Sequence, residues 1–170
     1  MESSIICEGM RENMIASKYV IRCGVGRSDN YLPSFDKALL EAGVGNYNLV
    51  RLSSILPAKC KRVEYIDLPE GSLLPTAYAT ETSDVCGETV TSVIGVGIPK
   101  DENSVGVIME YSCKGFSARK NIAMHVLEHM IKEAFDIRGW ELKEIISDGI
   151  EARVDGRQTC TTFACIAEWE

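Results

Sequence analysis

The stretch Asn48-Leu-Val-Arg-Leu-Ser-Ser-Ile-Leu-Pro57 sets two serines, Ser53 and Ser54, inside a run that otherwise has the pattern of an apolar β-strand. Tandem serines at strand ends usually bond their hydroxyls to nearby backbone groups. A second chemistry is open to them, because Ser54 Oγ can attack the carbonyl of Ser53 and turn the peptide bond into an ester. β-Elimination of the ester leaves a carboxylate on Ser53 and a dehydroalanine at position 54, which hydrolyses to a pyruvoyl group and ammonia. The stretch predicts either an ordinary strand end or a self-cleavage site.

Segments on both sides of the tandem serines support the second interpretation. Gly43-Val-Gly45 precedes the stretch, and Gly71-Ser-Leu-Leu-Pro75-Thr-Ala-Tyr78, Gly106-Val-Ile-Met-Glu110-Tyr and Arg138-Gly-Trp140-Glu-Leu follow it. With these segments the sequence resembles the pyruvoyl-dependent arginine decarboxylases of archaeal type. The resemblance extends from about Asp36 to near the C-terminus.

The resemblance implies an enzyme that cleaves itself between Ser53 and Ser54 and carries a covalently bound pyruvoyl group derived from Ser54. The pyruvoyl carbonyl would hold the amine of L-arginine and accept the electrons left by departing carbon dioxide, giving agmatine. No pyridoxal phosphate and no metal are expected. The resemblance also implies a homotrimer of cleaved protomers, with pockets between neighbouring subunits.

Two residues of the stretch and its surroundings are candidates for catalysis. Glu110 shares its strand face with Gly106 and Ile108, and such surroundings suit a proton donor, although a strand-end glutamate can also simply reach water. Asn48 lies six residues before Ser54, so the two side chains share a face if the strand is continuous. Its amide could polarise the Ser53 carbonyl or orient the substrate, but most such asparagines form turns. The resemblance implies that Glu110 is the proton donor and that Asn48 is catalytic.

Asp36 is the candidate for substrate recognition. It falls in the first turn of a predicted helix, where the helix dipole favours a carboxylate without any ligand. The resemblance implies that Asp36 holds the substrate guanidinium, whose planar donors suit a carboxylate, and that Gly45 and Asn48 also bind the substrate. Decarboxylation of another amino acid, or a non-processing relative that only binds a cationic amino acid, remains an alternative.

Composition indicates one compact domain. The 170 residues carry a net charge of −7, which argues against nucleic acid as a partner, and the apolar runs are too short to cross a membrane. Seven cysteines, an odd number with no Cys-x-x-Cys pair, are expected to be free thiols in the cytoplasm. Residues 1–17 lack a sustained period and are expected to form a flexible tail, followed by a decarboxylase domain over 18–170 that is cleaved into 1–53 and 54–170.

Hydrophobic periodicity predicts two helices, one from about Pro33 to Gly43 and one over 117–137. Strands are expected at 19–24, 48–56, 60–66, 73–80, 90–98, 105–111, 140–146 and 158–169, with 150–154 pairing in a hairpin between the last two. Many neighbouring strands with short connections favour an antiparallel α+β sandwich. The resemblance makes this a four-layer αββα sandwich.

Two other motifs have competing interpretations. His125-Val-Leu-Glu-His129 has the spacing of an inverted zinc-protease motif, which would make the chain a metal-dependent hydrolase, but the helical wheel places both histidines opposite the apolar face. Gly24-Val-Gly26 is a partial dinucleotide fingerprint without the βαβ unit that such a site requires, and Gly95-Val-Gly97 lies within a predicted strand and so cannot open a phosphate-binding helix. We interpret the histidines as solvated surface and the glycines as turn or close-packing residues.

Overall fold

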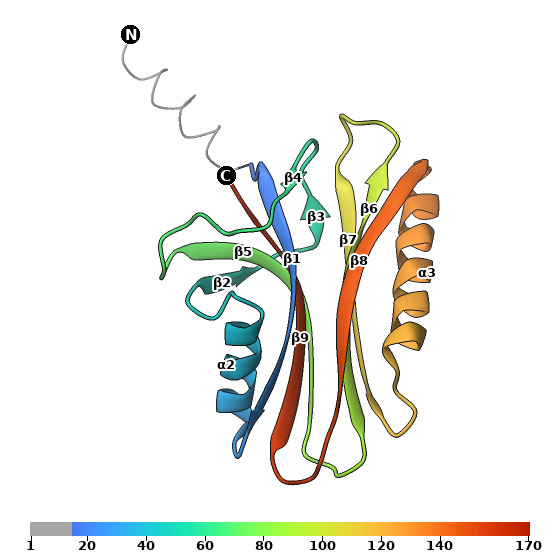
Figure 1. The fold of residues 1–170 in the computed structure, drawn as a ribbon. Coiled ribbons are helices and arrows are strands. Elements are labelled where there is room, and N and C mark those ends of the chain that lie inside the picture. The colour runs from blue at the N-terminus through green and yellow to red at the C-terminus, as the bar shows by residue number, and fades with distance from the viewer. Residues whose placement is uncertain (1–14) are drawn as a thin grey trace.

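The computed structural model describes residues 15–170, so that most of the predicted N-terminal tail, residues 1–14, lies outside the described part. Two sheets stack face to face, and one helix covers the outer face of each (Figure 1). The predicted four-layer αββα sandwich of mainly antiparallel sheets is therefore confirmed.

The first sheet has five strands in the order β2-β5-β9-β1-β4. Their bounds are β1 Lys18–Ser28, β2 Asn48–Arg51, β4 Lys61–Arg62, β5 Leu73–Ser83 and β9 Thr159–Trp169. The three long strands pair antiparallel, whereas the short edge strands β2 and β4 run parallel to β5 and β1. The first half of the tandem-serine stretch thus forms one edge of this sheet.

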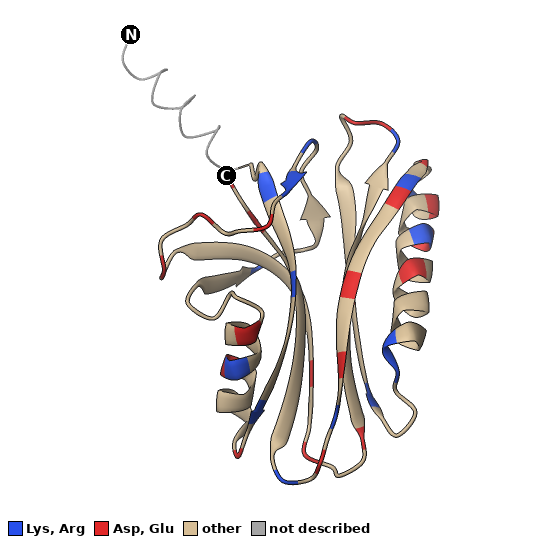
Figure 2. Ribbon diagram, viewed as in Figure 1, with Lys and Arg blue, Asp and Glu red and all other residues tan. Residues whose placement is uncertain are grey.

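The second sheet is antiparallel throughout, in the order β3-β7-β6-β8. Its strands are β3 Ile55–Leu56, β6 Thr89–Pro99, β7 Gly106–Gly115 and β8 Leu142–Arg153. Charged residues recur along the edge strand β8 (Figure 2), and charges on an edge strand discourage pairing with a further strand. At the opposite edge β3 covers only the first two residues of β7.

Each helix rests on a pair of glycines in the sheet beneath it. Helix α2, Tyr31–Glu41, packs on β1 and β9, and α3, Lys120–Arg138, packs on β6, β7 and β8. A Cβ on Gly26 would overlap the backbone of α2 at Ser34, and a Cβ on Gly97 would lie 2.5 Å from the Phe135 ring of α3. The interpretation of both Gly-x-Gly motifs as close-packing residues is confirmed. Gly43, with φ of 75°, follows the end of α2 as predicted.

Apolar side chains fill all three interfaces between the layers. Between the sheets lie Tyr19, Ile21, Leu56, Ala77, Ile94, Val96, Ile108, Ala164 and Ile166. Under α2 lie Val20, Ala38, Ala42, Val44, Leu74, Phe163, Cys165, Ala167 and Trp169. Under α3 lie Val93, Val107, Ala123, Leu127, Ile131, Ala134 and Phe135. Alternation along each strand decides which interface a side chain enters.

One carboxyl group is buried in this interior. Glu168 is only 4% exposed, and its Oε1 atom has no hydrogen-bond partner among the described residues. It lies directly across the β1–β9 pair from Tyr19, on the face turned toward the second sheet. Burial raises the pKa of Glu168 to about 7. Burial, and secondarily the charge of Glu168, raises the pKa of the Cys60 thiol to about 12.

Three strand predictions were wrong. The expected strand 48–56 is two strands in different sheets, β2 and β3. Only residues 61 and 62 of the expected strand 60–66 pair. The expected hairpin over 140–154 is the single strand β8, because Gly149 packs against Val93 within the sheet instead of making a turn. No helix within residues 15–170 is long and apolar enough to cross a membrane.

Candidate active site

The tandem serines lie where the chain passes from one sheet to the other. β2 ends at Arg51, at the edge of the first sheet, and β3 begins at Ile55, at the edge of the second. The NH of Leu52 donates to the Thr76 carbonyl (3.1 Å), and the Ser54 carbonyl accepts from the NH of Ile108 (2.9 Å). The Ser53–Ser54 peptide bond is thus held from both sides by different sheets.

Ser54 has a strained backbone. Its φ is 72°, and Lys59 is the only other non-glycine residue between 15 and 170 with a positive φ. The left-handed conformation costs a non-glycine residue roughly 1–2 kcal/mol, so the surrounding hydrogen bonds must maintain it. Residues held in such conformations cluster at functional sites.

The Ser54 hydroxyl faces the carboxylate of Glu110. Ser54 Oγ donates to Glu110, at 3.0 Å from Oε2 and 3.2 Å from Oε1. Glu110 lies two residues beyond Ile108 on β7 and therefore turns inward between the sheets, with 24% of its side chain exposed. The predicted nucleophile and proton donor are in direct contact.

A pocket of about 290 Å³ opens beside this pair. It is lined by Ser53, Ser54, Ile55, Val107, Ile108, Met109, Glu110, Met130 and Arg138. Met130 and Arg138 come from α3. The Arg138 guanidinium donates to the Ala134 carbonyl (2.9 Å) and lies over the Trp140 ring, 5.6 Å from its centroid.

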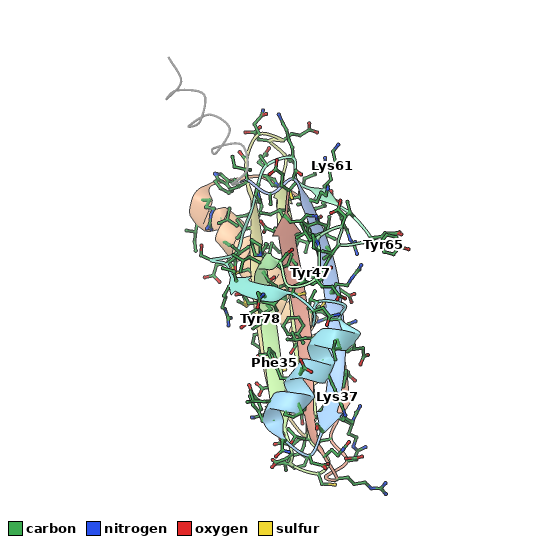
Figure 3. All side chains as sticks on the ribbon, turned by 90° about the vertical axis from the view of Figure 1, so that its left-hand side faces the viewer. Phe35, Lys37, Tyr47, Lys61, Tyr65 and Tyr78 are labelled. Atoms are coloured by element: carbon green, nitrogen blue, oxygen red, sulfur yellow. The ribbon has the colours of Figure 1, made fainter. Side chains whose placement is uncertain are left out.

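Arg51 also lies near Glu110. Its Nη2 atom lies 4.0 Å from Glu110 Oε1 and donates to the Tyr78 carbonyl at 3.3 Å. The guanidinium also lies over the Tyr78 ring, 4.5 Å from the centroid. Tyr78 packs against Phe163 and faces the observer beside α2 in Figure 3.

The three predicted substrate-binding residues do not join this pocket within the single chain. Asn48 Nδ2 donates to the Gly71 carbonyl (2.7 Å), and the face that it was expected to share with Ser54 does not exist, because the strand is interrupted. Asp36 is exposed on α2, which covers the outer face of the first sheet, and Gly45 lies in the turn that follows α2. The pocket holds Ser53, Ser54 and Glu110.

Sequence reasoning did not identify Arg51, Tyr78 or Met130 as neighbours of the Ser54–Glu110 pair. Arg51 lies three residues before Ser54 in the quoted stretch, and a charge at the end of an apolar strand was the available signal. No such signal was available for Tyr78 and Met130, because tyrosine in a strand and methionine on an apolar helix face are ordinary core residues.

The rival metal motif lies on a solvated surface. His125 and His129 are both exposed on α3, as the helical wheel predicted. Around them lie Glu128, Lys132, Glu133 and Asp136. Within residues 15–170 no three histidine, cysteine or acidic side chains are arranged to hold a metal ion.

The fold and the Ser53–Ser54–Glu110 site are those expected of a lyase that depends on a pyruvoyl group in place of pyridoxal phosphate. Comparison with known proteins identifies the particular family. The model of the family described as pyruvoyl-dependent arginine decarboxylase matches residues 18–169. The chain belongs to this family.

Three relatives illustrate the similarity. The pyruvoyl-dependent arginine decarboxylases of Methanococcus maripaludis strain C5 and of Methanocaldococcus jannaschii are each 44% identical to this chain over 146 residues, covering 86% of this chain and 86% of the relative. That of Thermococcus sibiricus is 38% identical over 154 residues, covering 88% and 93%.

Proposed function

We propose that this protein decarboxylates L-arginine to agmatine and carbon dioxide, using a pyruvoyl group that it makes from Ser54. The contact between Ser54 Oγ and Glu110 Oε2, 3.0 Å apart at a strained tandem-serine bond, is the observation that carries the proposal. It unites an attackable peptide bond, its nucleophile and a carboxyl group in one pocket. Membership of the family supports the same function.

The residues fit the formation of the group. Ser54 Oγ forms a bond to the Ser53 carbonyl carbon, the carbon–nitrogen bond breaks, and the hydroxyl proton moves to the nitrogen. Loss of the Ser54 Cα proton then breaks the Cβ–Oγ bond, so that Ser53 leaves as a carboxylate. The resulting dehydroalanine takes up water and releases ammonia. Apart from the water consumed in the last step, the reaction uses only atoms of Ser53 and Ser54.

In the mature enzyme, the pyruvoyl group supplies a carbonyl that anchors the substrate amine and accepts the electron pair left by carbon dioxide. Glu110 is positioned to deliver a proton to the substrate carbon that loses its carboxylate. Val107, Met109 and Met130 form the apolar part of the pocket wall. Arginine as substrate is supported by the family and by the role that we propose for Asp36.

We further propose that the protein assembles as a homotrimer in which a neighbouring copy completes each pocket. Within one chain Asp36 lies on α2 and Asn48 on β2, on the first-sheet side, while Glu110 belongs to the second sheet. Large apolar side chains are exposed near Asp36 and Asn48, namely Leu32 (71%), Val50 (43%) and Leu73 (70%). A second copy that covered them would bring Asp36, Gly45 and Asn48 to a Ser54–Glu110 pair.

We also propose a cytoplasmic location. Cysteines 23, 60, 86, 113, 160 and 165 are free, which is the state that a reducing compartment maintains.

Intact mass under denaturing conditions tests the function. The wild type should separate into residues 1–53 and 54–170, and the N-terminus of the larger fragment should resist Edman chemistry. Ser54→Ala should remain one chain and release no carbon dioxide from arginine, because it lacks the nucleophile. Ser53→Ala is the matched control and should still cleave, because it retains both Ser54 Oγ and the carbonyl under attack. Cleavage of Ser54→Ala at this bond would refute the assignment, and a wild type that stays intact but binds arginine would identify a non-processing binder.

A further inference from the structure

The side chain of Arg51 is held in place beside the bond that we expect to break. It is the last residue of β2, three positions before Ser54. Because β2 ends there, the following residues of β5 have no paired strand on that side within residues 15–170. The Arg51 guanidinium donates to the carbonyl of Tyr78 and stacks over the Tyr78 ring. Tyr78 is itself fixed by Phe163, with ring centroids 5.3 Å apart. The cation is therefore anchored by a group outside the reacting pair.

The remaining side of the guanidinium faces the reaction. Arg51 Nη2 lies 4.0 Å from Glu110 Oε1, and the same carboxylate accepts the hydrogen bond of Ser54 Oγ. Among the ion pairs formed by residues 15–170, this one alone includes a residue that lines the pocket. Arg138 lines the pocket from α3, but its guanidinium is engaged with the Ala134 carbonyl and Trp140.

Self-cleavage creates a new negative charge close to this cation. Before the reaction the Ser53 carbonyl is neutral, and after β-elimination it is a carboxylate that ends the small fragment. The new carboxylate belongs to the second residue after Arg51, within about 7 Å of chain. A planar guanidinium binds a carboxylate through paired hydrogen bonds. Charge that develops as the Cβ–Oγ bond breaks is therefore stabilised in the transition state more than in the ester.

We propose that Arg51 stabilises the carboxylate that leaves on Ser53 during β-elimination, and then retains it as the C-terminus of the small fragment. The inference rests on the proposed self-cleavage and adds to it a residue for the second chemical step. In the uncleaved chain the guanidinium faces Glu110. In the cleaved chain the guanidinium binds the new Ser53 carboxylate instead, so that Glu110 no longer pairs with Arg51 and can face the substrate.

Hydroxylamine separates the two steps of self-cleavage. It splits the ester directly, leaving a hydroxamate on Ser53 and an unmodified serine at the start of the large fragment, whereas β-elimination yields the blocked N-terminus. Freshly expressed wild type, Arg51→Met and Arg51→Lys should be followed by intact mass with and without hydroxylamine. Arg27→Met, which removes a cation from the surface of β1, is the matched control.

Arg51→Met should process about tenfold more slowly than the wild type. This loss is smaller than that caused by removing a buried hydrogen-bond donor that stabilises a transition state, because the Arg51 side chain is 58% exposed. Hydroxylamine should split Arg51→Met as fast as the wild type, because ester formation does not need the cation. Arg51→Lys should recover part of the rate, and Arg27→Met should process normally. Two results would overturn the inference: an unchanged processing rate in Arg51→Met, or a variant that hydroxylamine cannot split, which would place the defect before the ester. A wild type that never cleaves would refute the self-cleavage itself, and it is recognised without any Arg51 variant.

Discussion

Glu110 has two different partners in this proposal, the Ser54 hydroxyl before cleavage and the substrate carbon after it. Glu110→Gln keeps the size of the side chain and an oxygen that accepts from Ser54, but it has no acidic proton to transfer. We expect this variant to cleave normally and still to attach arginine covalently on borohydride reduction. Its release of carbon dioxide should fall by roughly 10²- to 10⁴-fold, as for the loss of a general acid.

The matched control for this prediction is Glu128→Gln, on the solvated face of α3, which should keep full turnover. Labelled carbon dioxide from arginine measures turnover, and intact mass measures cleavage. Full turnover in Glu110→Gln would move the proton donor elsewhere, with Tyr111 or a bound water as the next candidates.

The buried carboxyl of Glu168 makes stability depend on pH. Its folded-state pKa is about 7, above the ordinary value of 4.5, so the folded protein retains a proton that the unfolded chain loses. The free energy of unfolding should therefore fall as the pH rises from 4.5 to about 7, and this contribution should then level off. A shift of this size corresponds to roughly 3 kcal/mol.

Glu168→Gln removes this titration. In the Ser54→Ala background, where the chain stays in one piece, urea unfolding should show little difference from the parent at pH 5 and a more stable variant at pH 8. Equal differences at both pH values would show that the Glu168 carboxyl does not titrate in this range.

Single residues also mark how far the sequence could predict the site. Ser54 and Glu110 were identified because their chemistry and the surrounding segments distinguish them, and the structure places them in contact. Arg51 was not identified, because the sequence does not indicate which partner a charged residue at the end of a strand will contact. The contact with Glu110 arises only when two sheets bring their edges together, and a sequence pattern does not encode that approach.

Among the elements, helix α2 depends on glycine at two positions for different reasons. A Cβ on Gly26 would overlap the Ser34 carbonyl and lie 2.6 Å from the Ala38 nitrogen, so the helix backbone would have to move. Gly43 has open space around its Cβ position but a φ of 75°. In the same Ser54→Ala background, Gly26→Ala should lower the free energy of unfolding by about 3 kcal/mol or more, and Gly43→Ala by about 1–2 kcal/mol.

Thermal or urea unfolding measures both effects. If Gly26→Ala cost no more than Gly43→Ala, then α2 would not be seated on β1 as closely as the structure shows.

The long strands were predictable and the short ones were not. Strands β5, β6, β7 and β9 carry enough β-branched residues to be recognised by composition. The stretch 48–56 has the same character, but Ser54 adopts a positive φ and the chain changes sheets. A hairpin was expected within 140–154, whereas Gly149 lies inside a continuous strand, where a neighbouring side chain, Val93, excludes any larger residue.

For the assembled molecule, coexpression of two inactive variants tests whether the pocket is shared between copies. Asp36→Asn removes the carboxylate proposed to hold the substrate guanidinium, and Glu110→Gln removes the proton donor. If each pocket takes Asp36 from one copy and Glu110 from the next, random trimers should contain intact pockets at about a quarter of their sites. Activity should therefore return in the coexpressed protein but not in either variant alone.

The two variants mixed after separate purification are the control, since assembled trimers should exchange slowly. Light scattering should give the mass of a trimer. An active monomer, or coexpressed protein without activity, would contradict a shared pocket.

The position of β1 has a further consequence for the cleaved protein. β1 and α2 belong to the fragment 1–53, yet β1 lies between β9 and β4, which both belong to the fragment 54–170. The proposed cut at Ser53–Ser54 would therefore leave two polypeptides that are interleaved within one sheet. Before the cut, folding is a first-order process of one chain. After it, any molecule that unfolds completely must regain its structure by a second-order encounter, at a rate that falls with dilution. If the chain is cleaved as proposed, we expect the lifetime of the mature protein to be set by its unfolding rate, and so by the barrier that keeps β1 between its neighbours.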